Sequence, residues 1–155
     1  MSDLRDELYS LLVPLAGERL IVPRACVAEV IGYQPPAEMT NAPPWYAGLV
    51  TWGELTVPVV SFEGAFGQAL PSVSSRTRIV IFHAPGLPGG YFGMLTQGFP
   101  QLVRVNADVI RPDPSRSFPE RAPVICQVRM VNETPLIPDL TRLEQMIAEE
   151  TSVMT

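Results

Sequence analysis

The sequence predicts an all-β domain, a barrel or a sandwich, that ends in one helix. Short runs of β-branched and aromatic residues recur about every eight to twelve residues, with turn residues between them. Seventeen prolines among 155 residues oppose a helical bundle, because proline interrupts helices. A helical pattern is found near the C-terminus, where Leu140, Leu143 and Ile147 share one face behind the candidate N-cap Asp139.

Residues 48–62 form the predicted hairpin around which the other strands are arranged. β-branched and aromatic residues flank the Gly53-Glu54 turn, and Gly53 can adopt the positive φ that a two-residue turn needs. Pro58 has no N–H to donate, so we expect its strand at a sheet edge or at a bulge. Trp52 either fills the barrel core or faces a partner, and the sequence leaves both alternatives open.

The remaining predicted elements follow from the same signals. Strands are expected at residues 9–15, 20–22, 27–31, 77–82, 91–95, 102–105, 124–131 and 134–137. Proline, glycine and small polar residues predict loops at 34–44, 63–75, 84–90 and 106–122. We expect a short polar arm over residues 1–7 and a frayed helix end from residue 149.

Composition argues for a protein that works without nucleic acid or direct membrane insertion. The net charge is −5, and all 11 basic residues are arginines, which favour directional pairing with carboxylates. The N-terminus lacks a signal-peptide pattern, and no apolar run approaches the ~20 residues that span a membrane. A cytoplasmic location is therefore expected, in which Cys26 and Cys126 stay reduced.

The sequence offers little for catalysis. His83 is the only histidine, and its position at a strand end favours a structural role. Glu29 lies on an apolar strand with no second carboxylate nearby for acid–base chemistry. There is no nucleophile-elbow serine, metal-ligand spacing or phosphate-binding glycine motif. We therefore predict no catalytic residue, metal or cofactor, and a binding module rather than a small enzyme.

Six short motifs in order resemble the CheW family, the adaptors that link chemoreceptors to the histidine kinase CheA. They are Val27-Ala28-Glu29-Val30, the stretch from Pro44 to Gly48, Val57-Pro58-Val59-Val60-Ser61-Phe62, the stretch from Gly93 to Phe99, Ile110-Arg111-Pro112-Asp113-Pro114 and Leu136-Ile137-Pro138-Asp139-Leu140. The resemblance implies one CheW-like domain over residues 1–155 with two SH3-like, five-stranded barrels around a joint core. The first lobe would cover about residues 20–83, and the second about 8–19 and 88–148.

The resemblance also implies what the surfaces do. Family members bind the helical tip of a methyl-accepting chemoreceptor in a groove between lobes, and the regulatory domain of a CheA-type kinase by lobe-to-lobe contact. The matching groove residues are Val27, Glu29 and Val30 on one side and Leu102 on the other. The apolar three, Val27, Val30 and Leu102, are either binding residues or core residues, and the sequence leaves both alternatives open. Gly48 and Gly93 match family glycines that shape the strands at the lobe junction. We count both with the partner-binding residues.

The chain departs from the family at the hairpin turn. Trp52, Gly53 and Glu54 replace a Leu-Arg-Gly sequence, and Ser61 and Gln97 replace two aspartates. These departures resemble ChpC, the accessory CheW-like protein of systems that control type IV pili and twitching motility. They imply altered partner contacts at residues 52–54. The alternative is an array component, structural or competitive, that binds only other CheW-like domains and neither receptor nor kinase.

Overall fold

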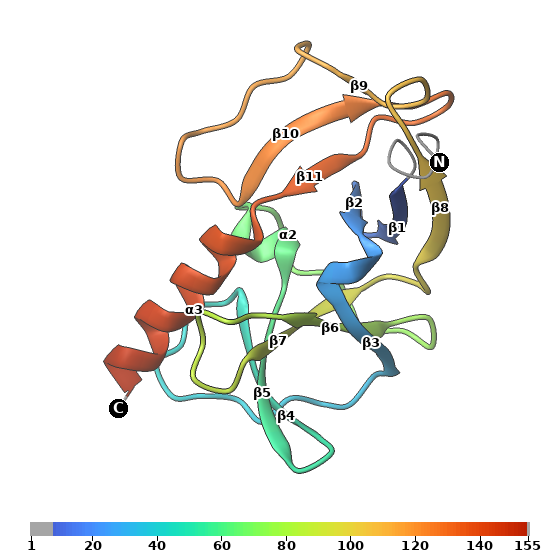
Figure 1. Ribbon diagram of the computed structural model, residues 1–155. Helices are drawn as coiled ribbons and strands as arrows, with labels where there is room; N and C mark the ends of the chain where they lie inside the picture. The colour runs from blue at the N-terminus through green and yellow to red at the C-terminus, as the bar shows by residue number, and fades with distance from the viewer. Residues whose placement is uncertain (1–7, 155) are drawn as a thin grey trace.

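The computed structural model describes residues 8–154, and within them the chain forms two curled sheets and one long C-terminal helix (Figure 1). The expected polar arm, residues 1–7, lies outside this range. A five-stranded sheet, here called lobe 1, has the order β3 (Val27–Gly32), β6 (Arg78–His83), β7 (Tyr91–Thr96), β5 (Leu55–Val60), β4 (Tyr46–Trp52). The predicted all-β class with a terminal helix is confirmed.

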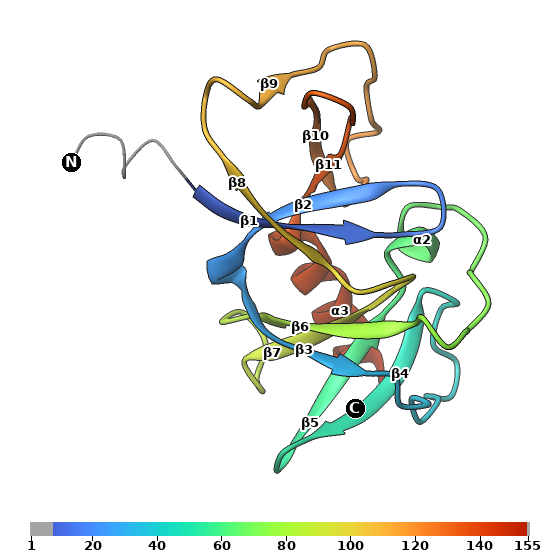
Figure 2. The same ribbon diagram turned by 90° about the vertical axis from the view of Figure 1, so that its right-hand side faces the viewer.

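The second sheet, here called lobe 2, lies above lobe 1 in both views (Figures 1 and 2). It has six strands within the described residues, because a strand of two residues is added at one edge. Its order is β8 (Gln101–Val105), β1 (Leu8–Pro14), β2 (Arg19–Pro23), β11 (Leu136–Pro138), β10 (Val124–Arg129), β9 (Arg111–Pro112).

Strand pairing moves two strands across the lobe limits expected from the sequence. β2 belongs to lobe 2, because it pairs along its whole length with β1. β7 belongs to lobe 1, because all six of its residues pair with β6. A turn connects β1 to β2, and another connects β6 to β7, and each turn favours a hairpin between the two strands that it joins. The chain therefore passes to the other lobe after β2 and after β7, in each case one strand later than expected.

The predicted central hairpin is present as β4 and β5. Gly53 has a φ of 62° at the turn, as expected. β5 is not an edge strand, since it lies between β4 and β7, but only Val59 and Val60 pair with β7. Pro58 is the residue just before that short ladder, where a missing N–H costs little. A bulge interrupts the opposite ladder between Tyr46 and Gly48.

A short helix, α2 (Phe62–Ala65), occupies the start of the segment that was expected to be a loop. The Ser61 hydroxyl caps it by accepting a hydrogen bond from the Gly64 N–H at 3.2 Å. Glu63 is 1% exposed, and its Oε2 accepts a hydrogen bond from the Ala16 N–H at 2.9 Å. The buried carboxylate therefore ties the β1–β2 turn of lobe 2 to lobe 1.

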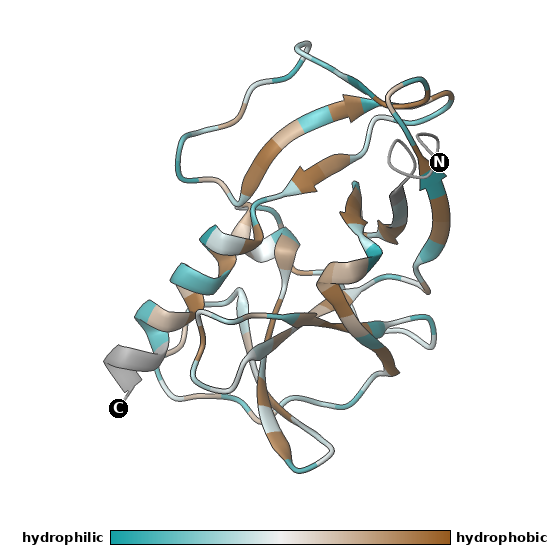
Figure 3. Ribbon diagram, viewed as in Figure 1, coloured by the Kyte–Doolittle hydropathy of each residue, from teal (hydrophilic) through white to brown (hydrophobic). Residues whose placement is uncertain are grey.

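A joint core holds the lobes together. It combines Val13 and Leu20 of lobe 2, the stacked rings of Phe82 and Phe92 of lobe 1, and Leu143 of the C-terminal helix α3 (Leu140–Met154). Each lobe also has its own smaller cluster of buried apolar residues. Apolar colour concentrates in the strands, whereas α3 alternates between the two colours, as an amphipathic helix does (Figure 3). The helix continues past residue 149, where fraying was expected.

The long loop between β8 and β10 is held at Asp113, which is 5% exposed. Hydrogen bonds from Ser115, through its hydroxyl and its backbone N–H, lower the pKa of Asp113 from 3.8 to about 2, with smaller contributions from Gln127 and Arg129. The Gln127 amide donates to Oδ2 at 3.0 Å, and Arg129 approaches Oδ1 at 3.2 Å. The ionised carboxylate thus fastens the loop to β10.

Candidate functional site

A groove between the lobes brings three of the predicted site residues together. Val27, Glu29 and Val30 of β3 line one wall, and the other wall is formed by Tyr9 and Leu11 of β1. The short 3-10 helix Arg24–Cys26, which joins β2 to β3, closes one end. The groove encloses about 630 Å³. β1 lies above β3 at this junction (Figure 2).

Leu102 extends the apolar surface of this groove. It lies on β8 directly opposite Leu11 of β1, and opposed residues of an antiparallel pair point to the same face of the sheet. Leu102 is 53% exposed, so it is a surface residue and not part of the core. On the same face the Arg104 guanidinium lies 5.7 Å from the centre of the Tyr9 ring, which gives the apolar surface a basic border.

Trp52 is neither fully buried nor fully exposed at the hairpin turn. Its ring is half-buried, packs against the apolar cluster of lobe 1, and meets Tyr91 edge-on with the ring centres 4.9 Å apart. Its indole Nε1–H donates a hydrogen bond to Glu29 Oε1 at 3.1 Å. The hairpin turn and the groove are therefore in direct contact, and the neighbouring Gly53 and Glu54 remain exposed at the turn.

The two predicted glycines are buried, which corrects their grouping with the partner-binding residues. A Cβ on Gly48 would lie 2.3 Å from the carbonyl oxygen of Ala37, and Gly48 has a φ of 137°. A Cβ on Gly93 would lie 2.8 Å from the Cγ2 atom of Ile79. Both positions need glycine so that chains can approach closely. They shape the strands of lobe 1 and present nothing for a partner to contact.

The histidine and the possible metal ligands among the described residues are spread out. His83 is exposed at the end of β6 and lies against the Tyr91 ring, with centres 5.5 Å apart. Nowhere in residues 8–154 do three His, Cys, Asp or Glu side chains gather as metal ligands would. No helix in that range is long and apolar enough to cross a membrane. What the structure offers is a shaped apolar surface with polar borders, which suits binding.

Sequence reasoning missed several residues of this site. Tyr9 and Leu11 line the groove but were assigned only to a strand, and Tyr91 was expected only to pair with its neighbour. No sequence signal separates Tyr9 and Leu11 from the other apolar residues of β1, and only the structure shows that Tyr9 is 53% exposed. The contact between Trp52 and Glu29 had no sequence signal, since 23 positions separate the two residues.

Comparison with known proteins gives results that agree with this geometry. The family model for the CheW-like domain matches residues 10–147. Among solved structures, the scaffolding protein TtCheW from Thermoanaerobacter tengcongensis is similar, with a TM-score of 0.71 and 18% sequence identity. That match covers 84% of this chain and 88% of the other, and it shows the shared fold of two SH3-like lobes. None of the curated protein sequences compared with the chain matches it.

Proposed function

This chain belongs to the CheW-like domain family, and we propose that it is a non-catalytic adaptor coupling chemoreceptors to a CheA-type histidine kinase in a chemosensory array. The observation that carries the proposal is the groove between the lobes, in which Val27 and Val30 face Leu11 and continue to the exposed Leu102. The protein would act in the cytoplasm, recruited to membrane-associated arrays by its partners.

The groove suits one helical partner in particular. An amphipathic helix binds by laying its apolar side chains into such a groove, and the methyl-accepting receptor tip is helical. The apolar residues of β3 and β1 would receive that face, while Arg104 and Arg24 at the borders would meet acidic side chains of the receptor. Val27, Val30 and Leu102 are therefore assigned to the receptor.

The hairpin turn is assigned to the kinase regulatory domain or to another CheW-like domain. Trp52 and Glu54 stand where the family has leucine and glycine, and Gly53 stands in place of the signature arginine. With the Trp52 indole N–H engaged by Glu29, the turn presents an exposed anion where the family presents a cation. We infer a changed kinase contact, as in ChpC-type proteins that serve systems controlling type IV pili and twitching motility.

The test is a binding measurement with purified receptor tip and, separately, with the kinase regulatory domain. Leu102→Arg should weaken receptor binding about tenfold or more, because it places a charge in an apolar contact. Val131→Arg is the control, since Val131 is 84% exposed in the β10–β11 turn and outside the groove. Circular dichroism checks that both variants fold. Unchanged receptor binding by a folded Leu102→Arg variant would refute the groove assignment.

A second variant examines the hairpin. Gly53→Arg restores the family's cation, and we expect no gain in kinase binding because the partner surface is matched to Glu54. Tighter binding would mean that the family contact is still in use. If neither receptor nor kinase domain binds but other CheW-like domains do, the protein is an array component of the structural or competitive kind and not a coupling adaptor.

A further inference from the structure

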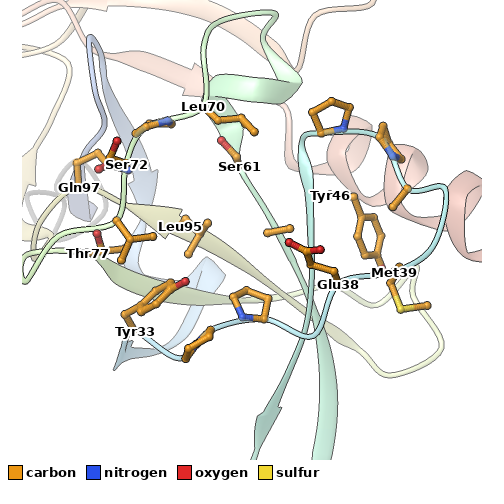
Figure 4. Close-up of a pocket in the computed structure, with 18 residues that line it drawn as sticks. Tyr33, Glu38, Met39, Tyr46, Ser61, Leu70, Ser72, Thr77, Leu95 and Gln97 are labelled. Atoms are coloured by element: carbon orange, nitrogen blue, oxygen red, sulfur yellow. The ribbon is translucent and has the colours of Figure 1, made fainter.

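A second concavity, separate from the groove, lies at lobe 1 between the β3–β4 loop and the segment that follows α2 (Figure 4). It encloses about 510 Å³, within the range of small-ligand sites. It shares no lining residue with the groove. The strand residue Leu95 lies at its base, and loops from both sides form its walls.

The walls of this pocket are conformationally restricted. Five prolines line it: Pro35, Pro36, Pro43, Pro44 and Pro71. An isolated bridge fastens the β3–β4 loop to β4, with the Ala37 N–H donating to Leu49 O at 2.8 Å and the Leu49 N–H donating to Ala37 O at 3.0 Å. Proline fixes φ, so little conformational entropy remains to be lost when a ligand binds. The pocket is therefore largely preformed.

Among the described residues, Glu38 is the only charged one that lines the pocket. Its carboxylate is directed into the cavity in Figure 4. Among the residues that the structure describes, it accepts no hydrogen bond and forms no ion pair; the ion pairs found there lie elsewhere. No arginine lines the pocket within the described chain.

Neutral polar residues line other parts of the pocket. Tyr33, Ser72 and Gln97 line the pocket and none of their side chains has a hydrogen-bond partner within residues 8–154. Figure 4 places Tyr33 on the side of the β3–β4 loop and Gln97 with Ser72 across from Glu38. Together these groups offer acceptors in several directions and one aromatic face. Leu95 and Leu70 add apolar surface between them.

We propose that this pocket binds a guanidinium group carried on a short alkyl chain. A carboxylate can hold a guanidinium by two parallel hydrogen bonds, which fits the Glu38 carboxylate. Guanidinium is also weakly hydrated and stacks on aromatic rings, which fits Tyr33 and the apolar walls better than a compact, strongly hydrated ammonium. The alkyl chain would lie along Leu95 and Leu70.

Two sources can supply this group: a free alkylguanidine or an arginine side chain of a protein partner. The test is an NMR titration of the full-length, ¹⁵N-labelled protein with propylguanidinium and with the blocked tripeptide Ala-Arg-Ala. Saturable shifts are expected at the backbone amides of Leu95 and Gln97. The uncharged analogues, propylurea and Ala-citrulline-Ala, should bind about tenfold or more weakly, because they cannot pair with the carboxylate.

The matched variants are Glu38→Gln and Glu120→Gln. Both glutamates are exposed, but only Glu38 lines the pocket, so Glu38→Gln should lose about tenfold or more in affinity while Glu120→Gln keeps it. Equal binding of both guanidinium probes indicates a free ligand, and a clear preference for the tripeptide indicates a partner's arginine. Absence of saturable shifts for both probes, or equal binding by the Glu38→Gln variant or the uncharged analogues, overturns the proposal.

Discussion

Gly48→Ala is the substitution for which the structure predicts the largest loss of stability at a predicted site residue. The added Cβ would lie 2.3 Å from Ala37 O and 2.7 Å from Ala37 C. Both are backbone atoms, so no side-chain rotation relieves the contact. The carbonyl also accepts the Leu49 N–H bond of the bridge that fastens the β3–β4 loop to β4. Relief therefore requires that the bridge opens.

The magnitude follows from two contributions. A φ of 137° is a region that residues with a Cβ rarely adopt, and such strain costs about 1–3 kcal/mol. Opening the bridge between Ala37 and Leu49 removes two backbone hydrogen bonds, each worth about 1 kcal/mol. The expected loss is about 3–5 kcal/mol in the free energy of unfolding. A small domain typically has only about 5–15 kcal/mol in total.

Urea unfolding followed by circular dichroism measures this loss, and two other glycines separate its contributions. A Cβ at Gly53 meets no atom within 4 Å but has a φ of 62°, so Gly53→Ala should cost about 1–2 kcal/mol. Gly32 has open space and no positive φ, so Gly32→Ala should change stability by less than about 1 kcal/mol. If Gly48→Ala costs no more than Gly53→Ala, the close approach of Ala37 carries no energy and the reasoning fails.

Three further outcomes are expected. Trp52→Phe keeps an aromatic six-membered ring but removes the N–H whose hydrogen bond Glu29 accepts. It should cost no more than about 1 kcal/mol in urea unfolding yet weaken partner binding, and a larger stability loss would contradict this. Because the pKa of Asp113 is lowered to about 2, its contribution to stability is present above about pH 4 and is lost as pH falls towards 2. Asp113→Asn should therefore flatten the pH dependence of the free energy of unfolding in that window, and an unchanged slope would count against this prediction. Cys26 and Cys126 are free and belong to different apolar clusters. Thiol titration of the denatured, unreduced protein should therefore find two thiols. Finding none would disprove a reduced pair.

Local patterns were sufficient to predict most elements of the fold. The Gly53 turn, the β-branched runs on both sides of it and the apolar face of Leu140, Leu143 and Ile147 each depend on neighbours a few positions away. α2 was missed because four residues of Phe-Glu-Gly-Ala carry little helical signal. That helix depends on the Ser61 cap and on Glu63, whose carboxylate is held by Ala16, 47 positions away.

The candidate site was predicted in part. Val27 and Val30 lie on one wall of the groove, and Leu102 lies on the surface that continues from the other; their contact with a partner stays a prediction. Tyr9 and Leu11 were missed, because β1 reaches the groove only after pairing with β8. The pocket at Glu38 was missed for a similar reason: its walls come from residues 33–44 and 70–77, two segments that look like unrelated loops in the sequence.

The sequence by itself determined that this chain is β-rich and ends in a helix, because hydrophobic period and turn residues are local properties. Only the tertiary structure decided where the lobes divide, that Gly48 is buried and that Trp52 holds Glu29. Those facts depend on which strands lie side by side, such as β2 against β1 and β7 against β6. Such pairings are made by contacts between residues that the chain order does not place together.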